Sequence, residues 1–136
     1  MSVEAKGLQY MEMKVQTATP EALVSMLYEG AIRFLNRAAY GLDQKDWQEA
    51  HSNIVRAQNI VTELNISLNK QRGGDIADNL ARIYDYLNNR LIEANIKKDA
   101  HSVNECINLL SDLNTAWHEV ARNVKGKSSA GVSLAG

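Results

Sequence analysis

Histidine, cysteine and glutamate side chains can bind metals or act in catalysis, but in this chain they do not occur at the spacings that such chemistry needs. A di-metal site in a helical bundle uses Glu-x-x-His pairs on two helices. None of His51, His101 and His118 has a glutamate three residues before it. A zinc site needs clustered cysteines and histidines, and Cys106 is the only cysteine. We therefore expect no metal, no cofactor and no enzymatic activity.

The sequence offers equally little for binding phosphate, nucleic acid or a membrane. The glycines of "RGGD" at 72–75 lack the spacing and the lysine of a phosphate-binding loop. Fifteen basic and sixteen acidic residues are interspersed and give a net charge of −1, without the basic patch typical of nucleic-acid binding. No apolar run approaches the roughly 18 residues that insert across a bilayer. A single cysteine and the lack of a secretory signal peptide predict a cytoplasmic protein.

Caps and apolar periodicity predict four long helices joined by short connections. Pro20 suits the first helical position after a cap, and the first helix is expected to run to about Leu42. Glu49 follows Asp46 by three residues, which is the pattern of a capping box, and the glycines of "RGGD" are expected to end the second helix. The predicted N-caps are Thr19, Asp46, Asp75 and Asp99.

These helices should pack as an all-α, antiparallel up-down four-helix bundle with an additional short N-terminal helix or segment. Short connections make consecutive helices neighbours, and Cys106 falls on the apolar stripe of the last helix, where we expect it to be buried. Trp47 and Trp117 are expected to plug the ends of the core, with a binding pocket as the alternative. The predicted parts are an N-terminal segment 1–18 able to cover a groove, the bundle 19–124, and a Gly/Ser-rich flexible end 125–136.

The stretch "VSMLYEGAIRFL" at 24–35 is apolar over most of its circumference, whereas a surface helix needs one apolar stripe. One interpretation is that this helix is central and covered by the N-terminal segment. The other is that the N-terminal segment covers a groove that an amphipathic partner helix otherwise occupies, and both can hold, one in each state. Gly30 could let a neighbouring helix approach closely. The candidates for partner binding are apolar residues expected off the core stripes, namely Val24, Tyr28, Ile32, Leu35, Val55, Ile66, Tyr86, Ile92 and Ile96, together with Tyr10 of the N-terminal segment.

Three stretches together resemble the flagellar secretion chaperones of the FliS family. They are "TATPEALVSMLYEGAIRFL", "GGDIADNLARIYDYLNNRLIEANIKKD" and the late "TAW". Tyr10 stands where the family has an N-terminal tyrosine, and Leu27, Tyr28 and Gly30 match its "MLYxG" stretch. Asn89 departs from the family pattern, in which an arginine is usual. The third-helix signature is matched by Ile83, Tyr84, Asp85, Tyr86, Arg90, Leu91, Glu93, Ala94 and Asn95.

The resemblance implies an antiparallel helical bundle in the bacterial cytoplasm that binds the disordered C-terminal segment of flagellin in hydrophobic surface grooves. It also implies that binding prevents premature polymerisation, that flagellin is delivered to the flagellar type III export gate, and that a short N-terminal segment moves when flagellin binds. Other flagellar regulators are further candidate partners. The residues by themselves leave two alternatives open: an adaptor or regulatory bundle for a different amphipathic helix, and a constitutive homodimer whose groove is its own interface.

Overall fold

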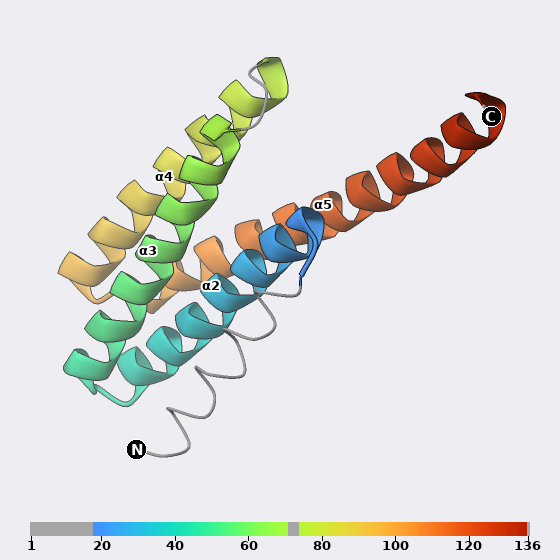
Figure 1. Ribbon diagram of the computed structural model, residues 1–136. Coiled ribbons are helices and arrows are strands. Elements are labelled where there is room, and N and C mark those ends of the chain that lie inside the picture. Colours follow the sequence, from blue (N-terminus) through green and yellow to red (C-terminus); the bar gives the residue numbers. More distant parts are fainter. Residues whose placement is uncertain (1–17, 71–73, 136) are drawn as a thin grey trace.

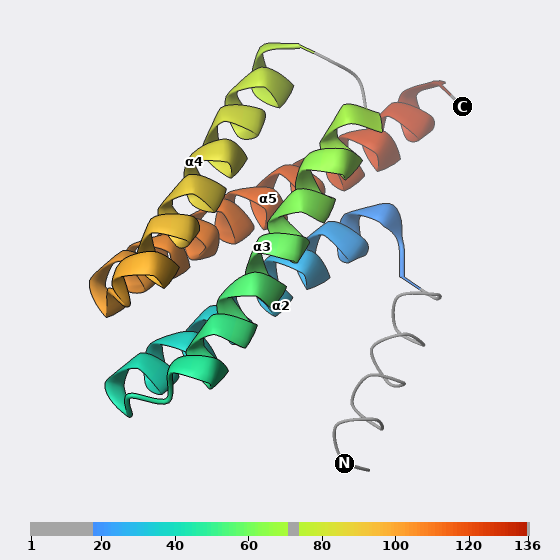
Figure 2. The same cartoon turned by 90° about the vertical axis from the view of Figure 1, so that its left-hand side faces the viewer.

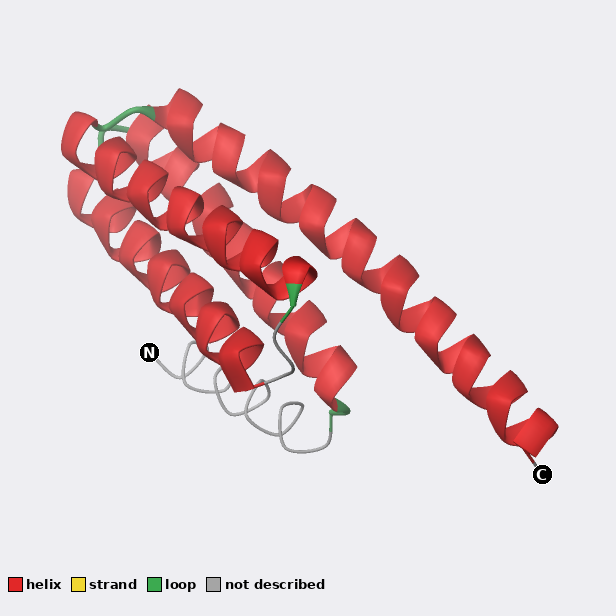
Figure 3. Cartoon of the chain, turned by 90° about the horizontal axis from the view of Figure 1, so that it is seen from above, coloured by secondary structure: helices red, strands yellow, loops and turns green. Residues whose placement is uncertain are grey.

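The computed structural model describes residues 18–70 and 74–135 as a bundle of four helices (Figure 1). Their bounds are α2 (Pro20–Asp43), α3 (Trp47–Lys70), α4 (Asp75–Lys97) and α5 (Ala100–Ala135). α2 packs against α3 and α5, and α4 packs against the same two helices. Consecutive helices run in opposite directions (Figure 2), and the part of the chain that is described contains no strand (Figure 3). The predicted all-α up-down bundle is therefore confirmed.

Three of the four predicted N-caps are formed as expected, namely Thr19, Asp46 and Asp99. The Thr19 hydroxyl accepts a hydrogen bond of 3.1 Å from the backbone N–H of Ala22, with Pro20 at the first position of α2. Asp99 accepts bonds from the His101 backbone N–H at 2.9 Å and from the Ser102 hydroxyl at 2.8 Å. The Ser102 hydrogen bond is the main cause that lowers the pKa of the Asp99 carboxyl. These caps bind N–H groups that the first turn of a helix leaves without a partner.

The predicted capping box and the predicted Asp75 cap differ from the structure. The Asp46 carboxylate accepts a hydrogen bond of 3.3 Å from the backbone N–H of Glu49. The reciprocal bond of a capping box, from the Asp46 N–H to the Glu49 carboxylate, is not made. The Asp46 N–H donates to the carbonyl of Gly41 instead, and the Glu49 carboxylate accepts from Asn53. Asp75 is the first residue of α4 and not its cap. Gly74 occupies the cap position with φ of 133°, a conformation that favours glycine. Because glycine has no side chain, no side-chain hydrogen bond caps α4.

The core runs along the inner faces of the four helices, and it includes two residues that the sequence pattern placed outside it. Tyr28 is 2% exposed and Leu35 is 0% exposed, so their expected position off the core stripe was wrong. Ala31 and Ala38 are also fully buried and share this stripe of α2. Small alanines carry a weak hydrophobic signal, although they allow close helix packing, and the true core face of this apolar helix was therefore hard to recognise.

The two tryptophans lie at the borders of the core. Trp47 is 46% exposed, so the expectation that it plugs the core was wrong. It is the first residue of α3, and the buried residues of this helix begin only at Ala50. Trp117 packs against the core only partly. On α5, the buried stripe that contains Cys106 ends before Val120, which is 51% exposed.

The ends of the chain bear on the predicted three-part division. Residues 1–17, which include Tyr10, lie outside the described residues, and the predicted covering role of the N-terminal segment stays a prediction. α5 continues as a helix through Ala135, although the Gly/Ser content predicts a flexible end from residue 125. Glycine costs a helix only about 1 kcal/mol relative to alanine, and no proline interrupts this stretch. No break in the helix marks residue 124.

Gly41, and not Gly30, allows a close approach between helix backbones. A Cβ at Gly41 would lie 3.1 Å from the backbone nitrogen of Ala50, whereas one at Gly30 would meet only the end of the Ile60 side chain at 3.3 Å. The backbone of α3 cannot move away without disturbing its first turn. The short connection after α2 therefore depends on the missing side chain at Gly41.

Gly41→Ala should lower the free energy of unfolding by about 1–3 kcal/mol, because the added methyl group overpacks a backbone contact. Gly30→Ala is the matched control. It gains up to about 1 kcal/mol of helix propensity, and the flexible end of Ile60 can shift, so we expect a change near zero or a slight stabilisation. Urea denaturation followed by circular dichroism measures both. Equal effects of the two substitutions would contradict the assignment.

Cys106 is buried, as predicted, and its thiol should be chemically inert in the folded protein. Burial, with a smaller contribution from Glu105, raises the pKa of the thiol to about 12. A raised thiol pKa stabilises the fold below the ordinary pKa of roughly 8.5, and this contribution is lost as the pH rises from there toward 12. At pH 8 we expect a disulfide reagent to modify Cys106 quickly in urea and very slowly in buffer. Rapid modification in buffer would show that the thiol is accessible.

Candidate functional site

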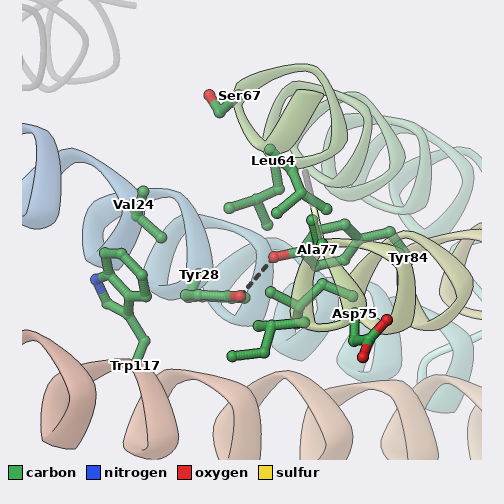
Figure 4. A pocket seen from close by; sticks show the side chains of 12 residues that line it. Val24, Tyr28, Leu64, Ser67, Asp75, Ala77, Tyr84 and Trp117 are labelled. Atoms are coloured by element: carbon green, nitrogen blue, oxygen red, sulfur yellow. Dashed lines mark hydrogen bonds between the residues drawn. The ribbon is translucent and has the colours of Figure 1, made fainter. Parts of the chain in front are cut away.

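An apolar cleft of about 550 Å³ opens at the end of the bundle where α2 and α4 begin and α3 ends. We call it the bundle-end cleft. Figure 4 shows side chains from all four helices around it. Its lining residues are Val24 and Tyr28 of α2, Leu64, Ser67 and Leu68 of α3, Gly74 before α4, Asp75, Ile76, Ala77, Leu80 and Tyr84 of α4, and Trp117 of α5. A mostly apolar concave site of this size suits apolar side chains of a partner.

A pair of tyrosines from opposite helices forms the polar floor of the bundle-end cleft. The hydroxyl oxygens of Tyr28 and Tyr84 lie 2.6 Å apart and share a hydrogen bond (Figure 4). Burial raises the pKa of both phenols, which keeps them neutral at physiological pH. The pair therefore satisfies two polar groups in an apolar site and offers a partner no charge.

The effects of removing the two hydroxyls of this pair should not be additive. Tyr28→Phe leaves the buried hydroxyl of Tyr84 without its partner, so we expect a loss of about 1–3 kcal/mol in the free energy of unfolding, and the same for Tyr84→Phe. The double variant should lose clearly less than the sum of the two single variants. Chemical denaturation of all four proteins measures this coupling. Additive losses would show that the hydrogen bond contributes nothing.

Polar contacts between α2 and α5 hold one wall of the bundle-end cleft. The Trp117 indole N–H donates to the carbonyl of Glu21 at 2.9 Å. One turn further along α2, the Ser25 hydroxyl lies 2.9 Å from His118 Nε2 and 3.3 Å from Asn114 Oδ1. Trp117 both packs on the core and lines the cleft, so the expectation of a core plug was incomplete. That this cleft binds a partner stays a prediction.

A second apolar surface lies on the outer side of α3 and α4, at the opposite end of the bundle. A hydrogen bond of 2.8 Å between Asn95 and His51 fixes how the two helices are aligned. Val55 lies one turn after His51 and is half-buried, while Ile92 and Ile96, one turn apart on α4, are 48% and 76% exposed. We call Val55, Ile92 and Ile96 the α3–α4 surface. Exposed aliphatic side chains gathered in this way are typical of a protein-binding surface.

The ten predicted partner-binding residues do not form one site. Val24 lines the bundle-end cleft, Tyr28 lies at its floor, and Leu35 belongs to the core. Ile32 is half-buried and packs against the core. The three residues of the α3–α4 surface form a separate group, and Ile66 and Tyr86 are 44% and 47% exposed at other positions. Tyr10 lies outside the described residues.

The predicted set missed most of the residues that line the bundle-end cleft. Leu64, Leu68, Leu80 and Ile76 line the cleft and are not among the predicted residues. Ile76 is 77% exposed although it is a large apolar residue in the first turn of α4. Its position directly after the expected start of a helix, ahead of the regular apolar stripe, was the available signal.

Tyr86 belongs to a network of charged groups between α4 and α5. Its hydroxyl donates to Glu105 at 3.3 Å, and the same carboxylate accepts from Arg90 at 2.6 Å. These hydrogen bonds, that of Arg90 first, lower the pKa of Glu105. Arg90 also pairs with Glu93 at 3.2 Å. Such exposed ion pairs contribute little to stability, so we assign the network to the alignment of the two helices.

The described residues contain neither a metal-binding cluster nor a membrane-spanning helix. Across 18–70 and 74–135, no three His, Cys, Asp or Glu side chains come together as metal ligands would. In the same ranges, every helix is too short or too polar to cross a bilayer. The expectation that the protein needs no cofactor stays a prediction.

Comparisons with known proteins agree on one family. Residues 4–124 match the family described as flagellar protein FliS. The flagellar secretion chaperone FliS of Bacillus subtilis (strain 168) is 33% identical over 123 residues, which cover 90% of this chain and 91% of the relative. That of Salmonella typhimurium is 37% identical over 120 residues, covering 88% and 89%. A crystal structure of a bacterial flagellar chaperone has the same fold, with a TM-score of 0.71 at 18% identity over 86% of this chain and 98% of the other.

Proposed function

Because the chain belongs to the FliS family of flagellar secretion chaperones, we propose that it binds the C-terminal segment of flagellin in the bundle-end cleft and along the α3–α4 surface. In the bacterial cytoplasm, this binding keeps flagellin from polymerising and delivers it to the flagellar type III export gate. Residues 1–18 are, in this proposal, the segment that covers an apolar groove before flagellin arrives. The role requires no catalysis.

The observation that carries the proposal is the bundle-end cleft itself. Its lining is mostly apolar and comes from all four helices, and the exposed Ile76 is part of it. An amphipathic segment can bury its apolar side chains there, each contributing about 1.5–3 kcal/mol when fully buried. Part of that gain offsets the entropy lost when a disordered segment becomes ordered. Several anchoring side chains are therefore needed, which fits two apolar surfaces better than one.

Calorimetric titration of the full-length protein with a peptide covering the C-terminal segment of flagellin tests the proposal. We expect one peptide per protein, a large negative heat-capacity change from apolar burial and a gain of helical circular dichroism. Affinity should depend weakly on salt, since the cleft offers few charges. Failure to bind, or an affinity that collapses at moderate salt, would contradict it.

The same titration separates the proposed role from its two alternatives. An adaptor for a different helix would leave the flagellin peptide unbound. A constitutive homodimer would sediment as a dimer at every accessible concentration and would not dissociate when the peptide is added. We expect a complex with the mass of one protein and one peptide.

A further inference from the structure

A cationic surface with an aromatic centre lies between α2 and α3. The Phe34 ring of α2 is half-buried between the two helices. The guanidinium carbon of Arg37 lies 5.8 Å from the centre of this ring, and that of Arg56, from α3, lies 5.7 Å from it. Distances of this kind are those of cation–π contacts. One ring thus holds two positive charges from two helices near each other.

Neither of these two arginines forms an ion pair with any residue that the structure describes. Arg90, by contrast, pairs with two glutamates. The two glutamates of α3, Glu49 and Glu63, are each seven residues from Arg56, and the carboxylate of Glu49 is already hydrogen-bonded by Asn53 at 3.0 Å. Tyr40, three residues after Arg37, is 56% exposed and extends the surface. We call Phe34, Arg37, Tyr40 and Arg56 the Phe34 surface.

The Phe34 surface is separate from the places proposed for flagellin. None of its residues lines the bundle-end cleft, and none belongs to the α3–α4 surface. The separation matters because a segment that occupies the apolar sites leaves these arginines uncovered.

We propose that the Phe34 surface binds an acidic helical segment of a second protein, independently of flagellin binding. Guanidinium groups bind carboxylates through paired, charge-assisted hydrogen bonds, and the contact with Phe34 restrains both groups before a partner arrives. Two glutamates about one turn apart on a partner helix can reach the two arginines. Apolar side chains between them can contact Phe34 and Tyr40.

The charge distribution favours a protein helix over a nucleic acid or a membrane. Glu49 and Glu63 lie seven residues before and after Arg56, on the same side of α3. They would repel a continuous row of phosphates, whereas two separate carboxylates can bind between them. A net charge of −1 also gives little general attraction for polyanions.

Fluorescence anisotropy with a labelled, capped helical peptide of about 15 residues, carrying glutamates at i and i+4 beside leucines, tests the proposal. The full-length protein should bind it, and the affinity should fall as salt rises from about 50 to 300 mM. Arg37→Gln with Arg56→Gln should weaken binding roughly tenfold or more, and Phe34→Leu should weaken it severalfold, because the arginines lose their aromatic support.

The double variant Arg82→Gln with Arg122→Gln is the matched control, since it removes the same charge from exposed positions elsewhere. It should bind the peptide within about twofold of the unchanged protein. Circular dichroism confirms that each variant is folded, and unchanged binding of the flagellin peptide keeps this test separate from the proposed function. An equal loss in the control pair, or equally tight binding to single-stranded DNA or phosphatidylglycerol vesicles, would overturn the proposal.

Discussion

Changing Ile76 to aspartate is expected to weaken binding of the flagellin peptide roughly tenfold or more, because the new carboxylate loses water only in the complex. The fold should be unaffected. Ile76 is 77% exposed, and it lies in the first turn of α4, where a negative charge interacts favourably with the helix dipole. We therefore expect the free energy of unfolding to change by less than about 0.5 kcal/mol. Calorimetry and urea denaturation measure the two effects.

Two further aspartate variants show where flagellin binds. Asn108→Asp adds the same charge to an exposed position of α5 and should leave affinity unchanged. Ile96→Asp, on the α3–α4 surface, should weaken binding if the segment reaches both apolar sites. Normal binding by the Ile76 variant would remove the bundle-end cleft from the proposal. Ile32→Asp is a poorer test, because Ile32 packs against the core and its change would also destabilise the bundle.

Leu35→Ala should give the largest loss of stability among the residues considered as partner contacts. Leu35 is fully buried at 0% exposure, and truncating a buried leucine typically costs 2–5 kcal/mol through lost burial and the cavity left behind. Ile96→Ala is the control, since at 76% exposure it should cost less than about 0.5 kcal/mol. The midpoint of urea denaturation, at constant slope, measures both.

This comparison distinguishes a core residue from a surface residue without any partner present. If the Leu35→Ala variant were as stable as the unchanged protein, Leu35 could not belong to the face of α2 that packs in the core. A large loss from Ile96→Ala would mean that this side chain is covered in solution, for instance by a second copy of the chain.

Local sequence signals predicted the elements well, because they act over a few residues. A threonine before a proline and an aspartate after two lysines were enough to place the starts of α2 and α5. Four helices with short connections then allow few arrangements other than an up-down bundle. Asp75 was misplaced as a cap because the sequence does not reveal that Gly74 takes a positive φ.

The bundle-end cleft could not be predicted in the same way. Its lining depends on how far α2, α3 and α4 extend at one end of the bundle and on where Trp117 reaches them, and these are properties of the packed helices. The apolar circumference of α2 agrees with its packing against both α3 and α5, while its covering by the N-terminal segment or by a partner stays a prediction. It could not show which side faces the core, because Tyr28 and Leu35 have the same apolar character as a partner-binding face.

The contact between the first turn of α2 and Trp117 of α5 has a consequence for synthesis on the ribosome. The hydrogen bond from Trp117 to Glu21 joins residues 96 positions apart. α2 and α3 follow each other in the chain and contact each other, so they can meet while the rest is still being translated. The wall contributed by Trp117 is added only after nearly all of the helical region has left the exit tunnel. A nascent chain therefore lacks one wall of the cleft until Trp117 has been made and has reached α2.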